Sequence, residues 1–250
     1  MSKNKKEKIT VYWSPWSLPE RAASMMLIDF KPTPLMSDIQ KKRAKNPIIP
    51  PSSSLQGGNY QTCSALHTFA KNMFILKSPI SAEVELNENG TIVKDSIFST
   101  WFYERISSVE NSFSLDLDIG WLFFSEETLS IEITSPYMHK TAYQDYGFTP
   151  AAQMDISSWF RPVPAIFQLW ENVKKFKIQE NEPILYIKFD TDKEIEFKRF
   201  IITPGIFNKS LACTKHKETF KFQTLEKLYK IFNSGGLKDQ LLKEIKENLI

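Results

Sequence analysis

The sequence predicts a mainly β protein, an antiparallel β-sandwich or jelly-roll-like body, with a C-terminal pair of α-helices that makes the overall class α+β. Short runs that alternate apolar and polar residues recur up to about residue 205, with turn residues between them. Beyond that point the apolar residues switch to helical spacing. We therefore expect a basic flexible tail at 1–8, a β-rich body at 9–205 and a helical pair at 206–250 packed on the body.

The strand predictions rest on local alternation and on turn residues. Leu129, Ile131 and Ile133 alternate with polar residues, which is typical of a half-buried antiparallel strand. Apolar alternation on both sides of Asn89-Gly90 predicts a hairpin over 81–95, because this pair tolerates the positive φ of a tight turn. Other runs typical of strands are Ile9–Trp13, Asn72–Lys77, Trp101–Tyr103 and Ile195–Ile201, and Cys63–Lys71 is compatible with a short helix.

The segment 154–189 holds the clearest strand signals. The runs 176–178 and 184–189 are rich in residues that suit a pleated surface, and the polar break between them predicts strand, turn, strand. Upstream, Pro162 and Pro164 exclude a regular helix. Trp159, Phe160 and Arg161 should therefore lie on a stiff extended segment, which is either a corner of the core or a ledge for binding.

Two further regions complete the expected organisation. Residues 31–59 carry five prolines and a basic cluster, so we expect a long excursion over the surface. Near the C-terminus, helical spacing relates two sets of apolar residues separated by Ser234-Gly235-Gly236: Leu225, Leu228, Tyr229 and Phe232, then Leu237, Leu241, Leu242, Ile245 and Leu249.

Charge and cysteine content limit the compartment and the partners. The net charge is +3, and the first eight residues account for all of it, so the remainder sums to zero. A neutral body argues against a nucleic-acid partner beyond weak contacts of the basic tail. Cys63 and Cys213 lie far apart in sequence, which predicts reduced thiols in a cytoplasm. No apolar run is long enough to span a bilayer, so we expect a soluble protein without membrane contact.

Signatures of catalysis and of metal binding are missing from the sequence. It contains no phosphate-binding Gly-rich loop, no Gly-x-Ser-x-Gly elbow and no His-Glu-x-x-His pair. The three histidines are far apart and none has an acidic neighbour at ligand spacing. We expect no cofactor and no metal, and binding rather than catalysis. His139 is retained as a candidate binding residue because it follows a strand in an aromatic loop.

The other candidate binding residues surround Arg161. Burying a guanidinium without a partner is very costly, so Arg161 is either paired, with Asp155 or Glu171, or open to a pocket or interface. Asp155 can accept a hydrogen bond from Arg161 or cap a turn. Trp159 and Trp170 offer aromatic faces for stacking on a ligand or partner.

One set of short motifs lies between residues 155 and 191: Asp155-Ile156-Ser157, Trp159, Arg161-Pro162, Phe167, Leu169-Trp170, Glu182-Pro183 and Lys188-Phe189-Asp190-Thr191. Together these motifs resemble an uncharacterised protein family of tailed phages of marine bacteria, the cyanophage-like myoviruses. The resemblance extends from Val11-Tyr12-Trp13 to the C-terminal helices. It implies a phage protein that acts by binding, as a virion component or host-interaction factor. The expected partner is a phage structural protein or a host protein, a homo-oligomer is compatible, and the location is the host cytoplasm or the virion.

The alternative is a small phage metabolic enzyme acting on a nucleotide or another small anion. Asp155 is followed by apolar strand-like runs and by a polar break before Ile184. This order of features is similar to that of the β-clip fold of trimeric dUTPases, although the Gly-rich motifs of that fold are missing. In this case Arg161 would hold the anion, Asp155 would act as base, and Trp159 or Trp170 would stack.

Overall fold

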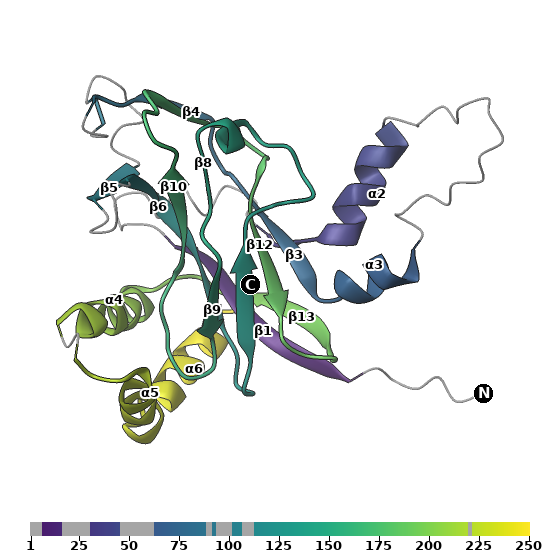
Figure 1. The fold of residues 1–250 in the computed structure, drawn as a ribbon. Coiled ribbons are helices and arrows are strands. Elements are labelled where there is room, and N and C mark those ends of the chain that lie inside the picture. The colour runs from purple at the N-terminus through teal and green to yellow at the C-terminus, as the bar shows by residue number, and fades with distance from the viewer. Residues whose placement is uncertain are drawn as a thin grey trace, which may run out of the picture.

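A computed structural model gives the fold and describes residues 7–16, 31–45, 63–88, 92–93, 102–106, 113–219 and 222–250. Side chains at 42–45, 103–106 and 217–218 are outside this description. The described part is mainly β and α+β overall, as expected from the sequence: several sheets form the body, and the C-terminal helices lie together beside it (Figure 1).

The largest sheet, sheet A, is built around β6 (Phe113–Phe124), a long strand buried along almost its whole length. Its pairs are antiparallel, except that β1 runs parallel to β13, with Ile9 opposite Ile195. The order is β13 (Glu194–Arg199), β1 (Lys8–Trp16), β6, β10 (Val163–Leu169) and β8 (Gly147–Phe148), and β5 (Phe102–Ile106) also pairs with β6.

The β6–β10 pairing contains a register shift between Pro164 and Ala165. Gly120 lies opposite this shift, where an added Cβ would be 2.8 Å from the carbonyl oxygen of Val163. A larger residue would push the two strands apart, so the glycine permits the close approach. This shift directly follows the Trp159–Arg161 segment.

Sheet B is centred on β12 (Pro183–Phe189), which is buried at nearly every position. Its order is β2 (Thr33–Pro34), β3 (Met73–Lys77), β12, β7 (Ser130–Thr134) and β9 (Ala152–Asp155). A small sheet pairs β11 (Lys175–Ile178) with β4 (Ala82–Glu85). The expectation of a strand pair within 176–189 is corrected here: β11 and β12 exist, but each pairs with strands distant in sequence.

All three sheets contribute to one core. Inward-facing residues of β6 and β12 meet there, and the rings of Phe123 and Phe189 lie edge to face with centroids 6.1 Å apart. Alternate residues of β1, β10, β4 and β11 complete the same cluster. The packing of two sheets around a shared apolar layer follows from the alternation that the sequence shows.

The region expected as a surface excursion contains regular structure. Within 31–59, β2 pairs with β3 and α2 (Leu35–Lys45) follows, while residues 46–59 lie outside the described part. Leu35 and Ile39 are buried against sheet B, so α2 packs on the body rather than passing over it. Pro32 and Pro34 precede α2, and the other three prolines of the region follow it, so none interrupts the helix.

Other local predictions agree with the structure. Helix α3 (Ser64–Phe69) lies within the predicted segment 63–71. The strand legs of the predicted hairpin are joined by an antiparallel bridge between Leu86 and Ile92, and the turn at 89–91 lies outside the described residues. Residues 1–6 of the expected basic tail also lie outside them, whereas Lys8 begins β1.

The C-terminal region contains three described helices where a pair was expected. Helices α5 (Leu225–Ser234) and α6 (Leu237–Glu247) match the predicted pair, and α4 (Pro204–Thr219) precedes them. Their inner residues form a second core with Tyr12, Leu122, Phe124 and Phe160 of the β body. The helices are therefore packed on the body. No helix in the described ranges is long and apolar enough to cross a membrane.

Candidate binding pocket

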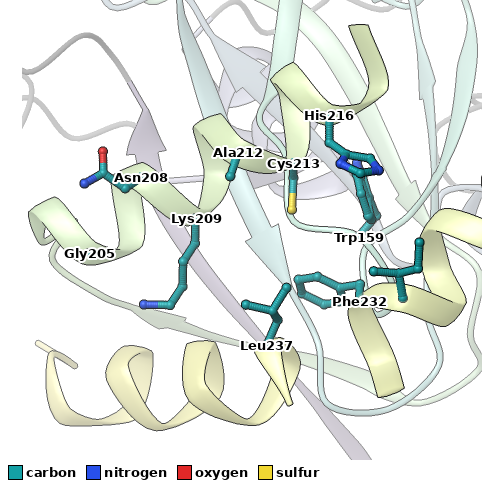
Figure 2. Close-up of a pocket in the computed structure, with 10 residues that line it drawn as sticks. Trp159, Gly205, Asn208, Lys209, Ala212, Cys213, His216, Phe232 and Leu237 are labelled. Atoms are coloured by element: carbon teal, nitrogen blue, oxygen red, sulfur yellow. The ribbon is translucent and has the colours of Figure 1, made fainter. Parts of the chain in front are cut away.

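Helix α4 provides one wall of a cavity. Its lining residues are spaced by three or four positions, so they share one face of the helix: Gly205, Asn208, Lys209, Ala212, Cys213 and His216. In Figure 2 the side chains of Lys209, Ala212 and Cys213 point from α4 toward α5 and α6. We call the space between them the α4–α6 pocket.

The rest of the α4–α6 pocket is apolar. Trp159 enters from the segment between β9 and β10, Phe232 and Ile231 come from α5, and Leu237 comes from α6. Trp159 and Phe232 are buried, whereas Ile231 and Leu237 are each 42% exposed. The cavity has a volume of about 400 Å³, within the range of about 300–1,000 Å³ that is typical of small ligand sites. It therefore has a buried aromatic wall and an exposed apolar rim.

Trp159 is fixed by aromatic neighbours from the helices. Its ring centroid lies 5.9 Å from that of Phe232 and 6.3 Å from those of Tyr229 and His216. Its indole N–H is buried and has no hydrogen-bond partner among the described residues. A buried unpaired donor costs about 1–3 kcal/mol, so packing rather than polar pairing holds this ring in place.

Cys213 contributes an uncharged thiol to the pocket wall. Burial raises the pKa of this thiol to about 11, although a hydrogen bond with the backbone of Phe160 acts in the opposite direction. At neutral pH the group is therefore protonated, and a protonated thiol is a poor nucleophile. Cys213 acts in the pocket as a small apolar side chain.

The polar end of the pocket is occupied by an ion pair. Lys209 Nζ lies 2.6 Å from Glu244 Oε2, and Thr203 Oγ1 donates a hydrogen bond to the same carboxylate. Burial alone would raise the pKa of Glu244, but the hydrogen bonds from Lys209 and Thr203 outweigh it and lower the pKa. An added Cβ at Gly205 would collide with Glu244, so the glycine lets α4 and α6 approach closely.

Asp155 and Arg161, both candidates from the sequence, lie near Tyr229 of α5. Asp155 Oδ1 accepts hydrogen bonds from Ser157 N at 2.7 Å, Ser157 Oγ at 2.7 Å and Ser158 N at 3.0 Å. Burial raises the pKa of Tyr229, Asp155 raises it further, and Arg161 opposes this. Arg161 is half-buried and forms no ion pair within the described part of the chain.

His139 belongs to a separate buried cluster. Its Nε2 lies 3.1 Å from Asp38 Oδ2, and its Nδ1 is hydrogen-bonded to the hydroxyl of Tyr186. Lys77 Nζ lies 2.5 Å from the other oxygen of Asp38. Burial raises the pKa of Tyr186, so its hydroxyl stays protonated at neutral pH. This cluster joins α2, the loop after β7 and sheet B.

Trp170 belongs neither to the surroundings of the α4–α6 pocket nor to the His139 cluster. It is 49% exposed, its ring centroid is 5.1 Å from that of Phe148, and its indole N–H donates to the carbonyl of Gln144 at 3.3 Å. Of the five sequence candidates, Trp159 therefore lines the α4–α6 pocket, Asp155 and Arg161 lie near its neighbour Tyr229, and His139 and Trp170 lie elsewhere.

Sequence reasoning did not find the α4 residues of the pocket. Their signal was present as the spacing of Gly205, Lys209, Ala212 and His216, but these residues are not uniformly apolar and so show no amphipathic stripe. Within the described ranges no three His, Cys, Asp or Glu side chains are placed to hold a metal ion.

Fold and site together define an α+β protein with an apolar pocket between helices. Comparisons with protein-family models, curated proteins and solved structures gave no match for this chain.

Proposed function

We propose that this chain acts by binding a protein partner, one of whose apolar side chains enters the α4–α6 pocket. The observation that carries the proposal is the combination of a buried aromatic wall with an exposed apolar rim at Ile231 and Leu237. Protein interfaces are commonly anchored by a few large side chains that fill such pockets. An apolar rim around the opening adds contact area that excludes water.

The lining groups support binding over catalysis. The thiol of Cys213 is protonated at neutral pH. Lys209 is held by Glu244, and His216 Nε2 lies 3.3 Å from the side-chain oxygen of Gln223. A nucleophile needs a nearby base and an oriented third group, and these pocket residues do not form such a set.

The phage setting of the proposal comes from the resemblance of the Asp155–Thr191 motifs to a family of tailed phages. On that basis the partner is a phage structural protein or a host protein, and the chain is a virion component or a host-interaction factor. Its location would be the host cytoplasm or the virion. A second copy of the chain is a further partner compatible with the pocket.

The enzyme alternative requires Asp155 to act as a base beside an anion held by Arg161. Asp155 Oδ1 already accepts three hydrogen bonds from its own turn, which favours a structural role for this carboxylate. A nucleotide panel tests the alternative directly. Turnover, or a rise in melting temperature that Arg161→Ala abolishes, would favour the enzyme over the binding protein.

A photo-crosslinking residue at position 231 tests the proposed function in the intact chain. Ile231 is 42% exposed and lies on the apolar rim of the pocket, so p-benzoylphenylalanine at this position keeps the rim apolar and should reach a bound partner without disturbing the core. We expect a discrete adduct with a phage or host protein in infected cells, identified by mass spectrometry. The matched control is the same residue at Ala152, an exposed position on β9. Equal adducts at both positions, or none at 231, would contradict the proposal.

A further inference from the structure

We infer that the partner segment bound by the α4–α6 pocket is acidic and amphipathic: one or two large apolar side chains enter the pocket, and carboxylates flank them outside. This inference rests on the proposed function, because it specifies the chemistry of the partner at the same site. Three features carry it, namely the size of the pocket, the character of its wall and the charge of the helices around it.

The volume of the pocket suits side chains better than a long ligand. About 400 Å³ is near the lower end of the range of about 300–1,000 Å³ for sites that enclose a drug-sized molecule. The exposed Ile231 and Leu237 continue the apolar surface beyond the cavity. A segment with apolar residues at helical spacing would place one side chain in the cavity and the next on this rim.

The wall excludes a charged group from the interior. Trp159, Phe232 and Cys213 are buried and present aromatic rings and a protonated thiol. A carboxylate placed against them would lose its hydration without gaining a partner, since Lys209 is already paired with Glu244. The charges of the partner must therefore lie outside the opening.

The helical segment that forms most of the pocket carries a net positive charge. Residues 204–250 contain nine lysines and five acidic residues, a net charge of +4, whereas residues 9–203 have a net charge of −4. On α4 and α5, Lys215, Lys227 and Lys230 are exposed and form no ion pair within the described ranges. These ammonium groups lie on two of the three helices that line the pocket, so they favour a segment with carboxylates next to its apolar side chain over a basic segment.

The helices also differ in charge from the surface that a second copy would present. The body of a second copy is acidic as a whole, so self-association is electrostatically permitted, and it must be distinguished by experiment. Self-association predicts a dimer whose amount depends on protein concentration. A separate acidic partner predicts a monomer that binds peptides.

The test is selection from a ribosome-displayed library of random peptides of about 16 residues, long enough for four helical turns. The bait is the full chain, and counter-selection uses Ala212→Trp, which fills the pocket from an exposed position without changing charge. We expect enriched peptides to have a net negative charge and at least one Phe, Trp, Leu or Ile. Their affinity should fall about tenfold or more for Ala212→Trp.

A charge-reversed variant provides the second readout. Lys215→Glu, Lys227→Glu and Lys230→Glu together should weaken the enriched peptides by about tenfold at low salt, and the difference should shrink at high salt. The matched control is Lys140→Glu, Lys174→Glu and Lys175→Glu, which reverses three exposed lysines away from the helices and should leave affinity nearly unchanged.

The outcomes separate this inference from the proposed function. Enriched peptides that are neutral or basic, yet lose affinity on Ala212→Trp, would overturn the acidic partner and leave the binding function standing. A dimer in sedimentation equilibrium that Ala212→Trp dissociates would identify a second copy as the occupant and overturn the inference. If no peptide distinguishes the wild-type chain from Ala212→Trp, the inference fails, and crosslinking at position 231 decides the proposed function independently.

Discussion

His139 Nε2 lies 3.1 Å from Asp38 Oδ2, although the two residues are 101 positions apart in the chain. The contact joins α2 to the loop after β7, and through Tyr186 it reaches the centre of sheet B. Lys77 balances the charge of Asp38 from β3. A buried polar cluster of this kind is stabilising only when its donors and acceptors are all satisfied.

Replacement of His139 by Phe should lower the free energy of unfolding by about 2–4 kcal/mol, because it removes the hydrogen bonds that His139 makes to the Tyr186 hydroxyl and to Asp38 in a buried cluster. Urea denaturation followed by far-UV circular dichroism measures the change. The control is Tyr137→Phe on a half-exposed residue, which removes only a weak hydrogen bond from the hydroxyl to Met73 Sδ at 3.7 Å and should cost no more than about 0.5 kcal/mol. Equal midpoints for the two variants would show that the cluster contributes nothing.

Leu241→Asp should destabilise the protein by about 4 kcal/mol or more, since Leu241 is fully buried between the helices and the β body. Leu237→Asp serves as the control on the same helix, because Leu237 is 42% exposed. Its effect should remain below about 1 kcal/mol. The two residues are four positions apart on one face of α6, so thermal unfolding of both variants distinguishes the buried part of this face from its exposed N-terminal end. Unchanged melting of Leu241→Asp would mean that this face is not packed.

The lowered pKa of Glu244 predicts that the protein loses stability in acid. Its pKa is lowered in the folded protein from an ordinary value of 4.5, because Lys209 and Thr203 stabilise the carboxylate despite its burial. A lowered folded pKa gives stability that is present above pH 4.5 and is lost as the pH falls through the folded pKa. The free energy of unfolding, measured between pH 3 and pH 7, should therefore decline on the acidic side of this window.

The matched variant for this prediction is Glu244→Gln. It should cost about 1–3 kcal/mol at pH 7, where the charge-assisted hydrogen bonds are weakened, and should show a shallower decline in acid than the wild-type protein. Parallel curves for the two proteins would show that other carboxylates dominate the acid sensitivity.

Cys213 should resist alkylation in the folded protein. With its pKa raised to about 11 by burial, the thiolate fraction at pH 8 is on the order of one in a thousand. Cys63 is exposed, so iodoacetamide should label it first, as followed by mass spectrometry. Both residues should react at similar rates in urea. Rapid labelling of Cys213 in the native protein would mean that the pocket opens readily.

Arg161→Ala should change stability by no more than about 1 kcal/mol, because Arg161 is half-buried and forms no ion pair in the described part of the chain. The sequence left two alternatives for this residue, a structural pair or a contact with a ligand or partner. Reduced crosslinking from position 231 in a normally folded Arg161→Ala variant would support the contact. A loss of about 3–5 kcal/mol would instead indicate a paired, buried charge.

The local sequence pattern was sufficient to predict those strands and helices that bury one face and expose the other. The alternation of Leu129, Ile131 and Ile133 predicted β7, and the spacing of Leu241 and Ile245 predicted α6 with its buried face. Both signals depend only on the periodicity of a strand or a helix relative to a core. The mainly β body and the helices packed on it follow from the same periodicities.

The tertiary structure alone decided which elements meet. The strands β11 and β12 are neighbours in sequence but pair in different sheets, because pairing depends on the complementarity of distant residues and not on the turn between them. For the same reason Trp159 gains Cys213 and Phe232 as neighbours, and His139 gains Asp38 and Tyr186. The sequence by itself determined residue types and periodic faces. The α4–α6 pocket and the buried cluster exist only because the packing of the sheets and helices around three apolar clusters brings those faces together.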